Sequence, residues 1–164
     1  CTMEITLQER TADHVRIYFE RTQDDQIDQM LPRSVNSLDQ ALENFAQTKL
    51  PDAKSYGKTI YADDRYIGDI WCYCIDPKET PNAMLSYCIF EKSCWGKGIA
   101  SRALSLFLDE IAEKYALSSV GAFTFADNIA SIRVLEKNGF SVKESFVEDG
   151  RESVYLEYRV QDRG

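Results

Sequence analysis

The period of the hydrophobic pattern changes along this chain, and the order of the changes limits the fold more than any other feature. A short alternating segment over residues 4–8 predicts a first strand. Up to Pro51 the apolar residues then recur at helical spacing, behind the capping residues Thr11 and Ser37. The first third of the chain is therefore expected to hold one strand and three helices, over 11–20, 24–31 and 37–49.

After Pro51 most apolar residues alternate with polar ones, which predicts strands with helices between only some of them. Asp149-Gly150 is typical of the tight turn of a hairpin, and Gly139 is expected to end a helix in the left-handed conformation. We expect strands over 55–61, 66–75, 84–90, 119–125, 140–147 and 153–160, and helices over 96–115 and 128–138.

The resulting order is β-α-α-α-β-β-β-α-β-α-β-β. Consecutive strands pair antiparallel when short turns join them, whereas a strand–helix–strand passage makes a parallel pair. The order therefore predicts an α+β fold, a mixed and mostly antiparallel sheet flanked by helices, and not a doubly wound parallel sheet. A length of 164 residues suits one domain over residues 1–164.

The charge balance limits the partners. Lys and Arg number 19 and Asp and Glu 27, a net charge of −8, and no basic cluster offers a nucleic-acid surface. The sequence contains no apolar run of about 18 residues, so no membrane span is predicted. No secretory signal pattern opens the chain, so we expect a cytoplasmic protein. An acidic protein is better matched to cationic small molecules or basic peptide segments.

The five cysteines do not form a metal-binding pattern. Cys72 and Cys74 stand two apart in an expected strand, so they are predicted to share one face. No CxxC pair accompanies them, and Cys88 alone would have to complete a three-cysteine site. We therefore expect free thiols in a reducing compartment and no metal.

One stretch predicts chemistry: an expected strand runs through Trp95-Gly96-Lys97-Gly98 into the longest helix. Helix N-termini present unpaired N–H groups, and glycines let an anion approach them closely. Gly96 and Gly98 also match half of a dinucleotide fingerprint, but Ser101 stands where its third glycine belongs. A P-loop pattern is absent.

A second motif begins at Asn128, continues through Ser131 and ends at Lys137-Asn138-Gly139-Phe140. Together with residues 95–100, about thirty residues upstream, it resembles the GNAT superfamily of acyl-CoA-dependent N-acetyltransferases. The nearest likeness is to the Rim-type (RimJ/RimL-like) protein N-terminal acetyltransferases and their small-amine relatives. The resemblance covers nearly the whole chain in element order and is specific over residues 84–140.

The resemblance implies that acetyl-CoA is the co-substrate and that the glycine loop wraps its pyrophosphate with backbone amides. Gly98 and Ala100 match the fixed positions of the family loop, while Trp95 stands where Gln or Arg is usual. The strand before the loop usually carries a bulge near Cys88-Ile89 and binds the pantetheine. The cofactor-binding residues implied are Ile89, Trp95, Gly96, Lys97, Gly98, Ile99, Ala100, Ser101, Asn128 and Ser131.

The family's catalytic tyrosine has no counterpart here, because Leu135 occupies its position. Ser131 is therefore expected to protonate the departing thiolate, and backbone N–H groups near Cys88 to stabilise the oxyanion. The family's glutamate at the start of the strand over 84–90 is also missing, which leaves Asp69 as the first candidate base and Glu91 as the second. A Cys88 acyl-enzyme is an alternative, but it would need the single histidine, His14.

The expected reaction is direct attack of a neutral amine on the acetyl carbonyl in a ternary complex. Deprotonation at pH 7 costs roughly 4.6 kcal/mol for a lysine-like amine and roughly 1.4 kcal/mol for an α-amine, which favours a peptide N-terminus. Polyamines and aminosugars stay open as acceptors, and a homodimer is the candidate assembly. The alternative function is an acyl-CoA-binding sensor or scaffold without turnover, suggested by the missing tyrosine and glutamate.

Overall fold

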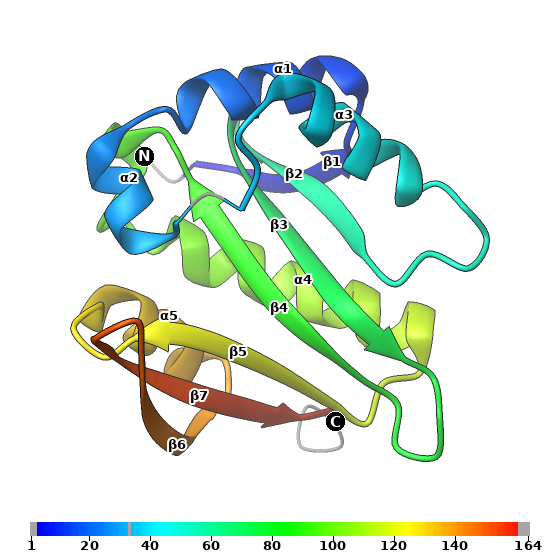
Figure 1. The fold of residues 1–164 in the computed structure, drawn as a ribbon, viewed down its shortest axis with the longest axis vertical. Coiled ribbons are helices and arrows are strands. Elements are labelled where there is room, and N and C mark those ends of the chain that lie inside the picture. The colour runs from blue at the N-terminus through cyan, green and yellow to red at the C-terminus, as the bar shows by residue number, and fades with distance from the viewer. Residues whose placement is uncertain (1–2, 33, 161–164) are drawn as a thin grey trace.

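The computed structural model describes residues 3–32 and 34–160, and the expected order of strands and helices is confirmed (Figure 1). The strands are β1 (Ile5–Glu9), β2 (Tyr56–Ala62), β3 (Arg65–Asp76), β4 (Asn82–Ile89), β5 (Ser119–Phe125), β6 (Ser141–Glu148) and β7 (Arg151–Arg159). The α-helices are α1 (Ala12–Arg21), α2 (Asp25–Met30), α3 (Leu38–Gln47), α4 (Ile99–Tyr115) and α5 (Ile129–Lys137).

The seven strands form one sheet in the order β1-β2-β3-β4-β5-β7-β6. Every pairing is antiparallel except that of β4 with β5, which follows from the helix between them. The parallel pairing covers only Asn82–Met84 against Ser119–Gly121. Beyond Met84 the two strands lose each other as partners, and the ribbons diverge (Figure 1). Strand β4 therefore has a free edge beyond Met84, and this edge positions the functional site.

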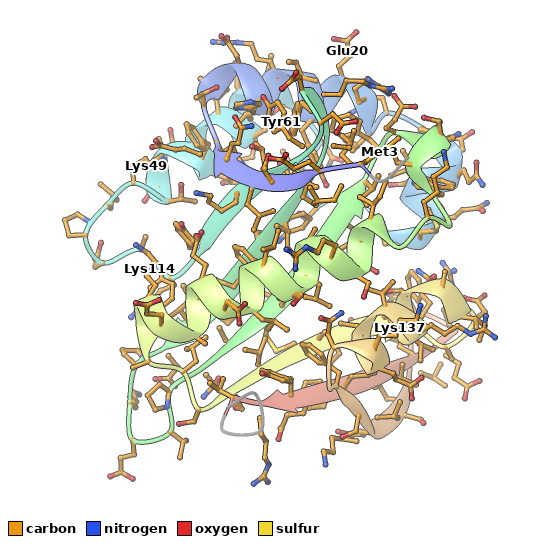
Figure 2. The ribbon with its side chains drawn as sticks, turned by 180° about the vertical axis from the view of Figure 1, so that it is seen from behind. Met3, Glu20, Lys49, Tyr61, Lys114 and Lys137 are labelled. Atoms are coloured by element: carbon orange, nitrogen blue, oxygen red, sulfur yellow. The ribbon has the colours of Figure 1, made fainter. Side chains whose placement is uncertain are left out.

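Helix α4 packs its apolar stripe on the sheet and fills the main core. Ile99, Ala103, Phe107 and Ile111 are buried as the spacing predicts, and Tyr115 is half-buried at the end of the stripe. Seen from behind, α4 crosses the sheet on the face opposite to α1 and α3 (Figure 2). The sheet thus has helices on both faces.

The opposite face of the sheet is covered less tightly. Helix α3 begins after the expected cap Ser37, yet none of its residues is fully buried. Two of its predicted apolar residues, Ala41 and Phe45, instead line a cavity between the helices and the sheet. The apolar stripe of α3 therefore forms the wall of a hollow and not the packed side of a core.

The long helix starts later than its hydrophobic period suggests. We expect it to begin at Gly96, but α4 begins at Ile99, and a short 3₁₀ helix over Lys92–Cys94 precedes it. Gly96 and Gly98 have φ angles of +74° and +77°. These left-handed conformations are incompatible with a right-handed helix, so the glycines form a loop at its N-terminus.

The two neighbouring cysteines do not share a face as predicted. Cys72 is buried, whereas Cys74 is exposed and has a φ of +51°. The pairing of β3 with β4 shifts register between Tyr73 and Asp76. This irregularity at Cys74 breaks the alternation of side chains and returns Ile75 to the buried face.

Candidate functional site

The first cavity lies where β4 and β5 diverge, and we call it the glycine-loop cavity. Its volume is about 410 Å³. One wall is the end of β4, over Leu85–Ile89, and the other is formed by Ala122–Thr124 of β5 and by α5. The loop around Gly96 and Gly98 and the first turn of α4 close one end. The second sequence motif and the glycine loop therefore meet at one place.

The glycine loop offers unpaired amides to this cavity. A Cβ built on Gly96 or Gly98 meets no atom within 4 Å, so both residues face open space. Among the residues that the structure describes, the N–H groups of residues 96–101 donate no hydrogen bond, and α4 has no side-chain cap. Such an end carries partial positive charge and binds phosphate groups.

The side chains around the cavity agree with an anionic ligand. Arg133 and Lys137 line it from α5, and its described lining contains no carboxylate, although the whole chain has a net charge of −8. Neither residue is among those predicted from the sequence. Their spacing of four residues, which places both on one face of a helix, is the signal that identifies them.

Trp95 positions the loop instead of weakening it. Its indole Nε1 donates a hydrogen bond of 2.8 Å to the carbonyl oxygen of Ile89 at the end of β4. The indole also packs against the core and lines the cavity. A residue that departs from the family pattern thus ties the glycine loop to the strand that faces it.

The remaining predicted loop residues divide by what their side chains do. Ala100 and Ser101 line the cavity, and the Ser101 hydroxyl accepts a hydrogen bond of 3.1 Å from Asn138 of α5. Ile99 also lines it, but its side chain is buried in the core. Lys97 is exposed and lies outside the lining, so it is not brought together with the others.

Two hydroxyl groups line the cavity, that of Ser131 from the second motif and that of Tyr87 from β4. Asn128 caps α5 by accepting the amide of Ser131 at 3.2 Å, as its position predicts. The hydroxyl of Tyr87, on β4, donates to Ser131 Oγ at 3.3 Å. Burial raises the pKa of Tyr87, so its hydroxyl keeps its proton at neutral pH. The sequence motifs do not identify Tyr87, because 44 residues separate it from Ser131.

The expected bulge lies slightly beyond its predicted position. The pairing of β3 and β4 stays in register through Cys88 and Ile89. The amides of Phe90 and Glu91 then both donate to the carbonyl of Ile67, at 2.9 and 3.4 Å, which is a bulged arrangement. Because amides alternate between the two edges of a strand, the N–H of Ile89 faces away from β3, toward the glycine-loop cavity.

A second cavity, of about 710 Å³, lies between β3, β4 and the helices α1 to α3, and we call it the helix-side cavity. Both cavities are lined by Ser86 and Cys88 of β4 and by Ile27 and Leu31. Two ligands bound in the two cavities would therefore meet at Cys88.

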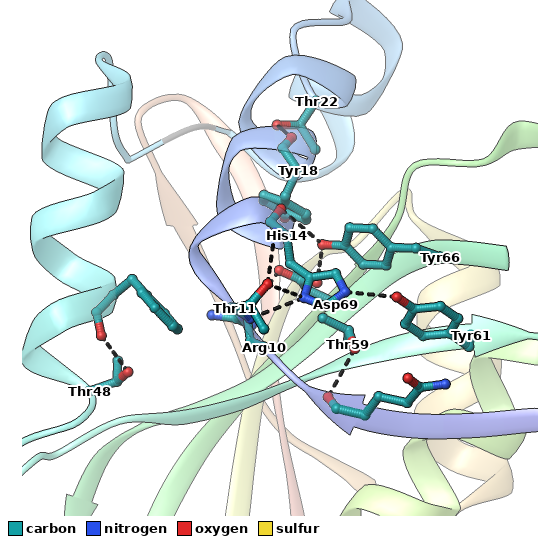
Figure 3. A network of polar contacts seen from close by, with 12 residues as sticks. Arg10, Thr11, His14, Tyr18, Thr22, Thr48, Thr59, Tyr61, Tyr66 and Asp69 are labelled. Carbon is teal, nitrogen blue, oxygen red and sulfur yellow. Dashed lines mark hydrogen bonds and ion pairs between the residues drawn. The ribbon is translucent and has the colours of Figure 1, made fainter. Parts of the chain in front are cut away.

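Asp69 lines the helix-side cavity and is 3% exposed (Figure 3). It forms an ion pair of 3.2 Å with Nε of Arg10 and accepts a hydrogen bond of 2.5 Å from the hydroxyl of Tyr66. Burial raises the pKa of Asp69 to about 6, while Arg10 and Tyr66 act to lower it. Asp69 is thus largely ionised at pH 7 and stands opposite Cys88 in the sheet register.

Cys88 and His14 do not form a nucleophilic pair. Burial raises the pKa of the Cys88 thiol to about 11, which keeps the thiol protonated at neutral pH. His14 is engaged elsewhere: Nδ1 contacts Thr11 at 3.0 Å and Nε2 contacts the hydroxyl of Tyr61 at 2.7 Å (Figure 3). The acyl-enzyme alternative therefore has no geometric support.

Glu91, the second candidate base, is committed to ion pairs. It contacts Arg65 at 2.8 Å and Arg21 at 3.1 Å, and hydrogen bonds from Arg21 and Ser93 hold its pKa below the usual range. It lines neither cavity. Asp69 is the better placed of the two carboxylates.

The described residues contain no cluster of metal ligands and no helix that could span a membrane. Within residues 3–32 and 34–160, no three His, Cys, Asp or Glu side chains gather as metal ligands would. No helix in the same ranges has the combination of length and apolar character needed to span a bilayer.

The geometry now joins the two motifs, and comparison with known sequences decides the family. A family profile described as an acetyltransferase (GNAT) domain matches residues 4–141. The chain belongs to the GNAT acetyltransferase family. A probable N-acetyltransferase of Bacillus subtilis strain 168, YjcK, is 32% identical over 96 residues, which cover 57% of this GNAT chain. That match spans about half, 52%, of the curated relative.

Solved structures share the GNAT fold at low sequence identity. Spermidine N-acetyltransferase from Vibrio cholerae, in complex with CoA and spermine, matches with a TM-score of 0.83 and 16% identity over 96% of each chain. The RimL ribosomal L7/L12 alpha-N-protein acetyltransferase with coenzyme A gives 0.80 and 18%, over 95% of this chain and 94% of that one. Aminoglycoside acetyltransferase AAC(6')-Ib, with coenzyme A and kanamycin, gives 0.80 and 16% over 96% of each.

Proposed function

We propose that this protein transfers an acetyl group from acetyl-CoA to a primary amine by direct attack in a ternary complex. The observation that carries the proposal is the glycine-loop cavity. Unpaired amides of residues 96–101 and the cations of α5 face a free strand edge there, with no carboxylate in the described lining. An anionic carrier whose chain runs along β4 fits this combination, and acetyl-CoA supplies the activated acetyl thioester.

Asp69 is proposed to take the proton of the attacking amine. Its pKa of about 6 leaves a carboxylate at pH 7, and its place in the helix-side cavity brings it next to Cys88, where the two cavities join. Attack forms the C–N bond and turns the carbonyl oxygen into an oxyanion, the amine proton passes to Asp69, and collapse of this intermediate breaks the C–S bond. The Ile89 amide at the free edge of β4 is proposed to stabilise the oxyanion, a role worth about 3 kcal/mol for one donor.

Ser131 and Tyr87 are proposed to protonate the departing thiolate. Ser131 lines the glycine-loop cavity, and Tyr87 donates a hydrogen bond to its hydroxyl, so a proton given up by Ser131 is replaced from Tyr87. A thiol of pKa about 8.5 needs only modest acid assistance, so two neutral hydroxyl groups are sufficient. Ser131 and Tyr87 together would replace the catalytic tyrosine of the family, whose position Leu135 occupies in this chain.

The acceptor is proposed to be a protein N-terminal α-amine or a small-molecule amine. The similar structures carry spermine, kanamycin or the name of a ribosomal-protein acetyltransferase, so they favour no one class. The likeness to the Rim-type subgroup, the cytoplasmic location and the homodimer stay predictions.

Calorimetry with acetyl-CoA, and with NAD as a control, tests the proposal. We expect saturable binding of acetyl-CoA at micromolar to millimolar concentration and none of NAD. Mass spectrometry of an acceptor mixture should then show an acetylated amine. Binding without any acetylated product would favour the sensor or scaffold function, and no binding would reject both.

A further inference from the structure

The described lining of the helix-side cavity carries almost no net charge, and this restricts what it accepts. Its described lining contains one carboxylate, Asp69, and one cation, Arg10, which are paired with each other at 3.2 Å. Glu110 contacts the hydroxyl of Tyr56 and forms an ion pair with Lys58, but it is not part of the lining. A polyamine or aminoglycoside would bring several ammonium groups, and only one compensated carboxylate would face them.

Aromatic rings form part of the cavity wall on several sides. Helices α1 and α3 and strands β2 and β3 contribute six rings to the described lining: Tyr18, Phe19, Phe45, Tyr56, Trp71 and Tyr73. Aromatic and apolar walls gain free energy when an apolar group displaces water from them. A volume of about 710 Å³ holds a large side chain and the group next to it.

Arg10 adds a requirement for an oxygen acceptor. Its guanidinium lines the cavity, its Nε faces Asp69, and its Nη2 is buried with no hydrogen-bond partner among the described residues (Figure 3). Gly57 allows this position, because a Cβ there would lie 2.5 Å from Nη2. Guanidinium N–H groups match carbonyl and carboxylate oxygens, and leaving them unpaired in a buried site is costly.

The same cation disfavours a charged amine. Arg10 already neutralises Asp69, so an ammonium group arriving there would meet a guanidinium. An α-amine, with a pKa near 8, enters uncharged far more easily than a polyamine nitrogen near 10. This inference rests on the acetyltransferase function proposed above. We propose that the acceptor is a hydrophobic α-aminoacyl compound. Such a compound has one amine, an adjacent carbonyl or carboxylate oxygen, and an apolar or aromatic side chain.

A matched panel of acceptors tests this inference on the full chain with acetyl-CoA. With kcat/KM expressed per concentration of neutral amine, which removes the difference in amine pKa, phenylalanine amide should be acetylated at least tenfold more efficiently than phenethylamine, which lacks the carbonyl, and at least a hundredfold more efficiently than spermine or kanamycin. Free phenylalanine and a peptide beginning with phenylalanine separate the two sources of the aminoacyl group. Equal use of spermine or kanamycin would overturn the inference.

Failure of the inference is distinguishable from failure of the proposed function. If calorimetry shows no binding of acetyl-CoA, the proposed function fails. If acetyl-CoA binds and the aminoacyl panel gives no product, or only polycations are acetylated, the inference alone fails.

Two substitutions assign the selectivity to the cavity. Arg10→Lys keeps the charge beside Asp69 but removes the fork of donors, so the ratio of kcat/KM for phenylalanine amide to that for phenethylamine should fall at least fivefold. Arg16→Lys is the matched control, because Arg16 lies exposed on α1 and, among the described residues, forms its ion pair with Asp13. Equal losses for both acceptors in Arg10→Lys would contradict the role of the guanidinium.

The complementary change adds charge to the wall. Asn44→Asp with Gln47→Glu places two carboxylates on the α3 side of the helix-side cavity, and acetylation of spermine should rise at least tenfold. Gln26→Glu, on α2 and outside the described lining, should leave the acetylation of spermine unchanged. No gain in the double variant would show that charge is not what excludes polyamines.

Discussion

The two cavities that meet at Cys88 are built from different parts of the chain's chemistry. The glycine-loop cavity presents backbone: unpaired amides after Gly96, a free strand edge and a helix N-terminus. The helix-side cavity presents side chains: six aromatic rings and the Arg10–Asp69 pair.

Backbone and side-chain sites respond differently to substitution. An amide survives most changes of its own side chain, so Trp95 can depart from the family pattern while the N–H groups stay in place. A side-chain site has no such protection, and one substitution removes a charge or a ring. The contrast predicts that the first cavity is sensitive to backbone conformation and the second to residue identity.

The largest effect should come from Gly98→Val, which attacks the backbone of the first cavity. Valine strongly disfavours a φ of +77°, so the loop must change conformation and its amides must turn away. We expect the affinity for acetyl-CoA, measured by calorimetry, to fall at least a hundredfold while the far-UV circular dichroism spectrum is retained.

Gly150→Val is the matched control for that change. Gly150 has a φ of +75° and open space around its Cβ position, but it lies in the β6–β7 turn. It should lose a similar amount of stability and keep its affinity for acetyl-CoA. Retained affinity in Gly98→Val would contradict the assignment of the loop.

Tyr87→Phe should produce the next largest effect, because it removes a side-chain hydroxyl from the otherwise backbone-built cavity. Ser131 loses the donor at 3.3 Å, and kcat should fall roughly tenfold, a small share of what acid catalysis contributes. The KM for acetyl-CoA should stay within twofold in steady-state kinetics. Tyr155→Phe, outside the described lining of both cavities, serves as control, and an unchanged kcat in Tyr87→Phe would exclude this hydroxyl from the reaction.

A smaller effect is expected from Tyr66→Phe, which removes the hydroxyl beside Asp69 of the helix-side cavity. The Tyr66 hydrogen bond lowers the pKa of Asp69, so its removal raises that pKa above about 6. Because the ionised carboxylate accepts the proton, the acidic limb of kcat/KM should move to higher pH, with a loss of about threefold near pH 6. Tyr61→Phe, whose hydroxyl contacts His14, should leave the limb in place. An acidic limb that does not move in Tyr66→Phe would remove Asp69 as the base.

Lys97→Ala should have the smallest effect. Its side chain is exposed and lies outside the described lining of the glycine-loop cavity, while its amide is kept in the variant. We expect the Kd for acetyl-CoA to rise less than threefold, about what one exposed charge contributes. A larger rise would mean that the loop binds through this side chain, and the contrast between the two cavities would fail.

The same contrast explains what the sequence could predict. Local signals worked: the turn at Asp149-Gly150 has φ angles of +53° and +75°, and Asn128 caps α5 as expected. Gly96 and Gly98 identify a loop because glycine itself readily adopts the left-handed conformation that a loop requires. The sequence prediction places the start of α4 too early, at Gly96, because a helical period of apolar residues carries no information about a positive φ angle.

Contacts between distant segments were not accessible in this way. Tyr87 faces Ser131 only because β4 and β5 diverge, and Arg10 reaches Asp69 only because β1 closes one edge of the sheet. The irregularity that exposes Cys74 depends on how β3 pairs with β4. An alternation of apolar and polar residues along one strand gives no information about that pairing. Asp69 was predicted as a candidate base, but its burial and its partners come from tertiary packing.

Most of the wall of the helix-side cavity comes from one continuous stretch, residues 10–57, whereas the glycine loop, α5 and the open strand edge lie after it. Selection can therefore act separately on most of these residues, except at Ile27, Met30 and Leu31, which lie in the first stretch and also line the glycine-loop cavity. Changes confined to the rest of the first stretch give descendants of this protein a new range of acceptors, and the inherited machinery for the acyl donor needs no change.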